Sequence, residues 1–456
     1  MTHVCRGWRE LLIARSSLWV RLDCVNTDRT RVYIERSKLA PLELSLYNNV
    51  DVGYLEEALL LVVPHIGRLK SLSLDGVGDD ILQDLTPYFS RHIPLLSKLT
   101  IDITWDPSPV MSTELFNGNL SSLRSLSLYG VITHLPWKNL SNLTTFQLSN
   151  VWEDSPSITQ LLDFLEDAHH LRDITLNHSM PTSSDASPGR VLSLPHLENL
   201  AIEADPDHST LLNHLSIPAG ALLTLTFAFV GDKSPVPDFL PKTLENLGNI
   251  FPISSVNLSL DDVWKNVRLS GPNGGLYMLG EWNDWGDGAV FPLSRRILRS
   301  LSRFDLSGTQ RLTVTQYKSP MLGIVDKSAP YLILSRMKDL RTLTLTQCNN
   351  KSFILALNPD RNSSKSALCP KLEDVVLYVE GVKSFNTKEL MSMAKERASA
   401  GVKLSSITVV GLGEPIPRKK VFGLGEYVTH VDYRIGEKPP RWDDVPGMRT
   451  IDLLVG

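Results

Sequence analysis

The stretch Leu123-Arg124-Ser125-Leu126-Ser127-Leu128-Tyr129-Gly130-Val131 decides the fold. Leu126 and Leu128 are two residues apart, so both side chains lie on the same face of an extended strand. The serine between them suits the solvent face of that strand. Gly130 then permits the positive φ that a turn leaving a strand needs. Val131, just after the turn, is predicted to return to the core.

The L-x-x-L-x-L spacing of this stretch recurs along most of the chain, with Ile, Val or Phe at some positions. The copies begin at Leu69, Leu96, Leu123, Leu143, Leu171, Leu197, Leu222, Ile253, Leu301, Leu340, Leu372 and Leu404. One such strand cannot bury its apolar side alone, whereas stacked copies bury a continuous core. Repeats of this kind typically run about 20–29 residues. The pattern therefore predicts a divergent leucine-rich-repeat solenoid over residues 66–412, which is an α/β fold.

The residue two positions after the third apolar residue is often Gly or Asn, and an apolar residue often follows it. The Gly and Asn positions are Gly76, Gly130, Asn150, Gly308 and Gly411, and the apolar residues are Val77, Val131, Val151 and Leu412. The more familiar repeat carries Asn or Cys at the apolar site, and only Cys348 matches it. We therefore expect no asparagine ladder.

Helices are predicted between the strands. Apolar residues at helical spacing mark residues 79–91, 157–168 and 388–400. The alternation of strand and helix predicts a curved parallel sheet, with the helices on the convex side.

The repeats are interrupted at about residues 260–296. Apolar segments on both sides of Ser270-Gly271-Pro272-Asn273-Gly274-Gly275 predict a β-hairpin with a Gly-rich turn. This is not a phosphate loop, because it lacks the Lys-Ser/Thr pair and a following helix. Trp282 and Trp285 follow in an acidic segment. They are a possible partner patch, and the alternative is that they pack over the solenoid edge.

The bulk composition narrows the class of protein. The chain has 456 residues, 42% of them hydrophobic, and a net charge of −4. That charge gives no basis for nucleic-acid or membrane binding. The chain has only four cysteines, which favours a reducing compartment. None of them forms a C-x-x-C pair, so a zinc or redox motif has no support. Without a signal peptide or a long apolar run, we expect a cytoplasmic or nuclear protein that is a monomer by itself.

The sequence contains no catalytic or metal-binding motif. Its eleven histidines are scattered, and His169-His170 sit where a repeat begins. No H-E-x-x-H, G-x-S-x-G or Cys/His pattern is present. We therefore expect no enzyme activity, no catalytic residue, no cofactor and no metal.

The N-terminus begins with a short amphipathic helix. Residues 4–12 read Val-Cys-Arg-Gly-Trp-Arg-Glu-Leu-Leu, with apolar side chains on one helical stripe. Ser16-Ser17-Leu18-Trp19 then predicts a turn into another apolar segment.

This combination resembles the second half of an F-box, whose pattern runs roughly V-C-x-x-W-x-x-[LI]-…-S-L-W. Residues 33–46 and 433–444 also resemble the lead-in strand and the closing segment of F-box/leucine-rich-repeat proteins of mushroom-forming fungi. The resemblance implies a partial helical F-box at 1–25 and a lead-in strand and linker at 26–65. The solenoid then spans 66–412, and a C-terminal strand with a Pro-rich tail spans 413–456.

The resemblance also implies a function. An F-box docks on a Skp-type adaptor, so the chain would be the substrate-recognition subunit of a cullin–RING (SCF-type) ubiquitin ligase, with its repeats holding an unknown protein substrate. The implied adaptor-binding residues are Val4, Cys5, Trp8, Leu11, Leu12, Leu18 and Trp19. The front-half motif L-P-x-[ED]-[IL] does not precede them, and half of an F-box would bury little surface. The alternative is a non-ligase interaction scaffold whose N-terminal stub only caps the solenoid.

Overall fold

The structure is a computed structural model of the 456-residue chain. It describes residues 5–47, 52–76, 87, 92–103, 110–111, 120–133, 139–151, 156–179, 189–204, 211–229, 240–260, 264–282, 301–316, 329–346, 350–359, 367–380, 387–412 and 422–436. The chain forms two compact units. The first comprises Met1–Phe229, Lys233–Asn249 and Asn273–Met278, and the second comprises Val230–Asp232, Ile250–Pro272 and Leu279–Gly456.

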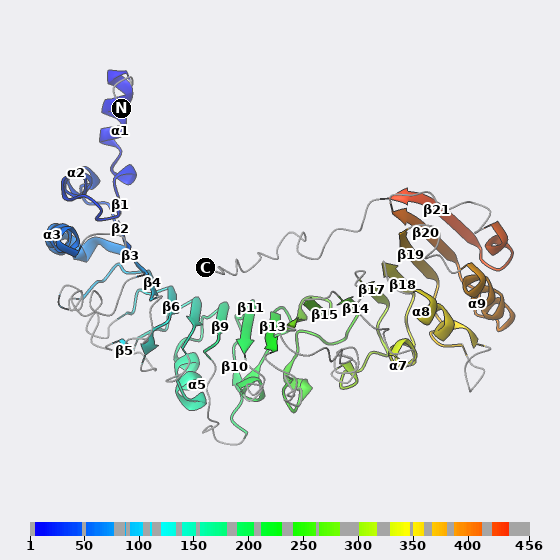
Figure 1. The fold of residues 1–456 in the computed structure, drawn as a ribbon. Coiled ribbons are helices and arrows are strands. Elements are labelled where there is room, and N and C mark those ends of the chain that lie inside the picture. The colour runs from blue at the N-terminus through cyan, green and yellow to red at the C-terminus, as the bar shows by residue number, and fades with distance from the viewer. Residues whose placement is uncertain are drawn as a thin grey trace, which may run out of the picture. The chain divides into compact units, whose positions relative to one another are not determined.

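The first unit is built on parallel strands that lie side by side, each paired with the next (Figure 1). In order they are β1 Arg21–Leu22, β2 Leu42–Tyr47, β3 Leu69–Asp75, β4 Lys98–Asp102, β6 Ser125–Tyr129, β8 Thr145–Ser149, β9 Asp173–Asn177, β11 Asn199–Ala204 and β13 Leu222–Phe229. The strands follow the repeat frame, because Leu126 is opposite both Leu99 and Phe146.

The helices of the first unit are α1 Arg6–Ala14, α2 Thr27–Ser37, α3 Val52–Val62 and α5 Ile158–Asp167, with 3-10 turns η1 Ser16–Leu18, η2 Val63–Arg68, η4 Leu211–His214 and η5 Leu244–Asn246. Short parallel pairs join β5 Val110–Met111 to β7 Ile132–Thr133 and β10 Leu192–Ser193 to β12 Leu215–Ser216. The predicted helix at 157–168 is confirmed by α5, whereas the one at 79–91 lies outside the described residues except for Pro87.

The second unit repeats the parallel arrangement. Its strands are β14 Ser255–Leu260, β15 Trp264–Ser270, β17 Arg311–Gln316, β18 Thr342–Thr346, β19 Asp374–Glu380, β20 Ser406–Leu412 and β21 His430–Gly436. β15 pairs antiparallel with β14, whereas β14, β17, β18, β19, β20 and β21 pair parallel, each with the next. Its helical elements are α7 Ala329–Leu334, α8 Asn350–Leu357, α9 Thr387–Ser399 and η9 Phe422–Glu426.

The recurring leucines form the core of both units. Leu69, Leu72 and Leu74 are at most 2% exposed, and the three leucines of the copy at Leu340 are fully buried. Each such side chain contributes about 1.5–3 kcal/mol when it is buried. Stacked parallel strands with a layer of helices give an α/β fold in a repeated, solenoid-like order, as the sequence predicts.

The turn chemistry is confirmed in the first unit. Gly76, Gly130 and Asn150 have φ of +66°, +65° and +56°, and His178 takes the equivalent place with φ of +45°. Val131 and Val151 return to the core and are buried. The same prediction is wrong for Gly308 and Gly411, which lack positive φ, and Gly411 lies inside β20.

Two of the predicted repeat copies are wrong. At Leu222 the frame is off by two residues, because Leu223 and Leu225 are opposite Leu200 and Ile202. The copy at Leu301 is not a strand: its three apolar residues are buried in a turn, and the strand is β17. A buried threonine, Thr309, takes the first position of that repeat, opposite Ile253. Its hydroxyl donates to the Ile253 carbonyl oxygen at 3.4 Å.

Strands also lie where the hairpin insertion was predicted. β15 ends at Ser270, and β16 Gly275–Trp282 begins after the Gly-rich turn. A Cβ on Gly274 would lie 2.5 Å from the Ala221 carbonyl oxygen and 2.7 Å from that of Ala219. This glycine is therefore required by a close approach of backbone to backbone.

Candidate interaction surface

The N-terminal helix α1 carries the stripe that the sequence singled out. It begins at Arg6, and Cys5 at its N-cap position gives it no side-chain cap. Arg6 and Glu10 form an ion pair at 2.8 Å on its polar side. That pair is fully solvated and adds little. The opposite side presents Trp8, Leu11 and Leu12 at i, i+3 and i+4 spacing, which places them on one face.

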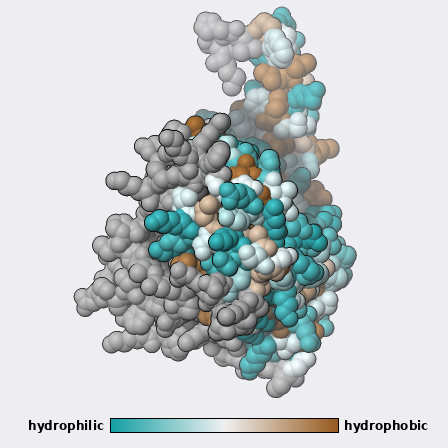
Figure 2. Space-filling view, turned by 90° about the vertical axis from the view of Figure 1, so that its right-hand side faces the viewer, coloured by the Kyte–Doolittle hydropathy of each residue, from teal (hydrophilic) through white to brown (hydrophobic). Residues whose placement is uncertain are grey.

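The stripe is exposed rather than packed. Trp8 is 62% exposed, Leu11 53% and Leu18 52%, and α1 buries none of its residues. Figure 2 shows hydrophobic surface along the N-terminal segment, at the top of the view. Scattered exposed leucines are normal, but several large apolar side chains grouped on one short segment indicate an interaction site.

Trp19 behaves differently from the other predicted residues. It is only 8% exposed, and its indole N–H donates to the Leu12 carbonyl oxygen at 2.9 Å. Its ring meets Tyr33 edge-on, with centroids 5.2 Å apart. Trp19 therefore lies beneath the exposed stripe. Cys5 is exposed, and Val4 lies outside the described residues.

Two further exposed apolar residues of the N-terminal segment were not singled out from the sequence. Ile13 is 39% exposed in the last turn of α1, and Val25 is 51% exposed just before α2. Ile13 follows Leu12 and so lies about 100° round the helix from it, on the side of Arg6 and Glu10 rather than on the apolar stripe. Val25 belongs to a connecting segment, where helical spacing gives no signal.

The proposed tryptophan patch is not brought together in the described residues. Trp282 ends β16, and Trp285 lies outside the part of the chain that the structure describes. The patch stays a prediction.

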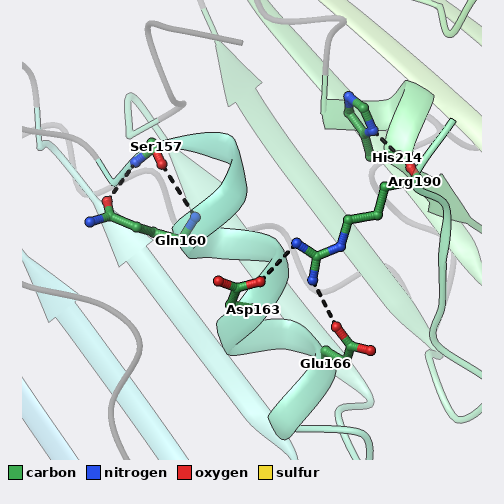
Figure 3. Close-up of polar contacts among 6 residues, drawn as sticks. All are labelled: Ser157, Gln160, Asp163, Glu166, Arg190 and His214. Atoms are coloured by element: carbon green, nitrogen blue, oxygen red, sulfur yellow. Dashed lines mark hydrogen bonds and ion pairs between the residues drawn. The ribbon is translucent and has the colours of Figure 1, made fainter. Parts of the chain in front are cut away.

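A polar cluster around α5 is a second candidate site (Figure 3). The Arg190 guanidinium bridges Asp163 and Glu166 on α5, with both N–O distances at 2.7 Å. The side-chain hydrogen bond with Asp163, followed by that with Glu166, raises the pKa of Arg190. His214 Nδ1 lies 2.8 Å from the Arg190 carbonyl oxygen. The two ion pairs join α5 to the segment at Arg190, and the His214 contact joins that segment to η4, so the cluster is structural.

The same helix shows a capping box, also drawn in Figure 3. Ser157 Oγ accepts from the Gln160 backbone N–H at 3.3 Å, and Gln160 Oε1 accepts from the Ser157 N–H at 2.9 Å. We expect Ser157→Ala to lower the free energy of unfolding by about 1 kcal/mol, because one orphan N–H at the helix start loses its acceptor. Denaturant unfolding measures this. Ser157→Asp keeps an acceptor and should retain most of the stability, so an equal loss in both variants would contradict the capping role.

Two of the described cysteines, Cys24 and Cys369, are buried free thiols. Burial raises the pKa of Cys24 and of Cys369 to about 12, so both stay protonated at neutral pH. His169 and His170 have ring centroids 4.3 Å apart, but no group of three or more His, Cys, Asp or Glu in the described chain could hold a metal ion. No described helix is long and apolar enough to cross a membrane.

Comparisons with known proteins do not assign the chain to a family. No family model matches the chain, and no curated protein matches it. Among solved structures it is similar to a crystal structure of a Bacteroides fragilis protein, with 10% sequence identity and a TM-score of 0.21. The match covers 89% of this chain and 78% of that one. A likeness at that TM-score carries no argument about fold or function.

Proposed function

We propose that this chain is a protein-recognition subunit that docks through its N-terminal segment and presents its repeats to a target protein. The observation that carries the proposal is the exposure of Trp8, Leu11 and Leu18 on a segment that buries little of itself. Aromatic and aliphatic anchors of this kind supply most of the energy of a protein interface once a partner covers them.

The sequence resemblance suggests the class of partner. Residues 4–19 follow the second half of the F-box pattern, and that family docks on a Skp-type adaptor of a cullin–RING ubiquitin ligase. The chain would then be the substrate-recognition subunit of such a ligase. The exposed residues Trp8, Leu11, Leu12 and Leu18 would contact the adaptor, and Trp19 would support them from below.

The alternative function is a scaffold whose N-terminal stub only caps the repeats. A cap must lay its apolar face on the end of the array. In this unit β1 pairs with β2, and α2 buries Thr30, Ile34 and Ser37. α1 buries nothing and leaves its apolar stripe exposed. The end of the sheet is thus covered by β1 and α2, which favours a partner rather than a cap as the role of α1.

Solvent-facing residues of the sheet would contact the target protein. In the first unit these positions hold mostly small polar side chains, among them Ser73, Thr100 and Ser127 on three adjacent strands. Because these side chains are short, the surface of another protein could lie close to this face of the sheet.

The test is co-purification of the chain with a Skp-type adaptor, with the front half of an F-box supplied as an N-terminal extension in a parallel arm. We expect Trp8→Ala to weaken binding at least tenfold, because truncating an aromatic anchor typically costs about 2 kcal/mol or more. Leu39→Ala is the matched control, since Leu39 is 90% exposed and lies outside the stripe. No binding in either arm, or equal binding by both variants, would refute the ligase proposal.

A further inference from the structure

The contacts of Trp19 suggest how the exposed helix is held. The last four carbonyl groups of any α-helix lack partners inside the helix. In α1 the Leu11 carbonyl oxygen accepts from the Arg15 N–H at 3.2 Å, and the Leu12 carbonyl oxygen accepts from the Trp19 indole at 2.9 Å. Trp19 therefore caps the C-terminal end of α1 through its side chain.

The indole is itself fixed by α2. The Arg36 guanidinium lies 4.5 Å from the centroid of the Trp19 ring, and Tyr33 packs edge-on against that ring. Tyr33 in turn lies under Arg29, whose guanidinium is 5.2 Å from the tyrosine centroid. Arg29, Tyr33 and Arg36 are spaced by four and three residues, so they form one face of α2. Cation–π contacts of this kind are attractive, and they strengthen when water is excluded.

α2 is tied to the repeats at its other end. Arg68, which ends η2 just before β3, donates to the Ser37 hydroxyl at 2.7 Å and to the Ala40 carbonyl oxygen at 2.8 Å. Burial lowers the pKa of Arg68, as expected for a guanidinium partly removed from water. A continuous series of contacts thus runs from Leu12 through Trp19 and α2 to Arg68, the residue before β3.

We propose that Trp19 is the positioning residue of the N-terminal docking surface, holding α1 in a fixed orientation relative to the first repeat. The proposal rests on the proposed function, because it assigns the surface to a partner. α1 buries none of its own residues, and within the described part of the chain the Trp19 hydrogen bond is the side-chain contact that joins α1 to later residues. Fixing α1 before binding lowers the ordering cost that a partner would otherwise have to offset.

The experiment compares Trp19→Phe with the wild-type full chain. Phenylalanine keeps an aromatic ring for Tyr33 and Arg36 but removes the indole N–H. We expect amide hydrogen exchange over residues 9–15 to become severalfold faster. Affinity for a Skp-type adaptor should fall about fivefold to tenfold, the size expected for one hydrogen bond. The unfolding transition of the repeats should not move, which separates positioning from a general loss of stability.

Trp8→Phe is the matched control, because Trp8 lies on the exposed stripe and makes no such tie. It should weaken adaptor binding without changing exchange over residues 9–15. Unchanged exchange in Trp19→Phe would overturn the proposal, as would faster exchange with unaltered affinity. If the wild-type chain binds no adaptor, the ligase proposal fails, while the exchange comparison still decides whether Trp19 holds α1.

Discussion

Replacing Arg397 by leucine is expected to lower the free energy of unfolding of the C-terminal repeats by about 3 kcal/mol. Arg397 lies on α9 and is fully buried. Its two terminal nitrogens donate to the carbonyl oxygens of Leu368 and Cys369, at 2.8 and 2.9 Å. Leucine would remove one donor from each carbonyl oxygen, at about 1–3 kcal/mol for an acceptor left unsatisfied. The Cys369 oxygen would keep the Leu372 N–H at 3.0 Å, so most of the loss comes from the Leu368 oxygen.

Removing Arg397 also has a stabilising effect, because a buried charge is itself costly. Burial lowers the pKa of Arg397, which records that cost. Replacing a buried polar pair with apolar groups on both sides is often neutral or favourable. Here only one side can be replaced, since the acceptors are backbone. The loss of both guanidinium hydrogen bonds, above all the one to the Leu368 carbonyl oxygen, therefore exceeds the relief of removing the charge.

The loop that Arg397 holds is also tied to the repeat before it. The Cys369 thiol donates to the Leu334 carbonyl oxygen at 3.3 Å, at the end of α7. A similar tie occurs at Arg336, which donates to the Phe304 carbonyl oxygen at 2.9 Å. Guanidinium groups thus join successive repeats in this unit. Loss of one such tie should loosen two neighbouring repeats.

Hydrogen exchange of the β19 and β20 amides is the appropriate measurement, because repeat arrays can open segment by segment. Arg341→Leu is the control. Arg341 is the same residue type in the same unit, but its side chain is 53% exposed and pairs with Glu373 at 2.9 Å. An exposed ion pair is worth less than about 1 kcal/mol. Equal effects of the two substitutions would show that burial of Arg397 does not matter.

The sequence could predict the strands because their apolar residues alternate and stack in register. The repeat predicted to begin at Leu222 begins two residues earlier. The buried residues there are Ala221, Leu223 and Leu225, and the same alternation of apolar residues fits both starting points. At Leu301 the three buried apolar residues suit a helical turn as well as a strand. The true first position, Thr309, is polar and is recognised only through its bond to Ile253.

Contacts distant in sequence could not be predicted at all. Arg397 lies in a helix beside other charged residues, and this sequence pattern predicts that its side chain is exposed to solvent. It is buried because two carbonyl groups, 28 and 29 residues earlier, meet it. The stripe of α1 was predictable from local spacing, whereas the burial of Trp19 depends on Tyr33 and Arg36 of another helix.

Gly130→Ala is expected to destabilise the first unit by about 3 kcal/mol, from two sources that add. The first is conformational: φ is +65°, and alanine in the left-handed region costs about 1 kcal/mol. The second is steric, because the new Cβ would collide with the Ile103 carbonyl oxygen. Ile103 is at the equivalent place of the preceding repeat, so the clash lies between two layers of the array.

The backbone cannot easily move away from that clash. The Gly130 N–H donates to Ser149 on one side, and the Ile103 N–H donates to Tyr129 on the other, both at 2.9 Å. Asn150 occupies the next equivalent place with φ of +56°. Positive φ alone is therefore tolerated by a side chain in this array. Gly130 differs from Asn150 because there is no room for a Cβ atom at its position.

Matched glycine substitutions separate the two sources. Gly189→Ala has φ of +86° with nothing within 4 Å of the new Cβ, so it should show the conformational cost alone, about 1 kcal/mol. Gly67→Ala has open space and no positive φ, so it should be close to neutral. Denaturant unfolding of the three variants should rank them Gly130, Gly189, Gly67 in order of decreasing loss. If Gly130→Ala proved as mild as Gly189→Ala, the layers would not be packed as closely as the turn requires, and the stacked-strand description of this unit would need revision.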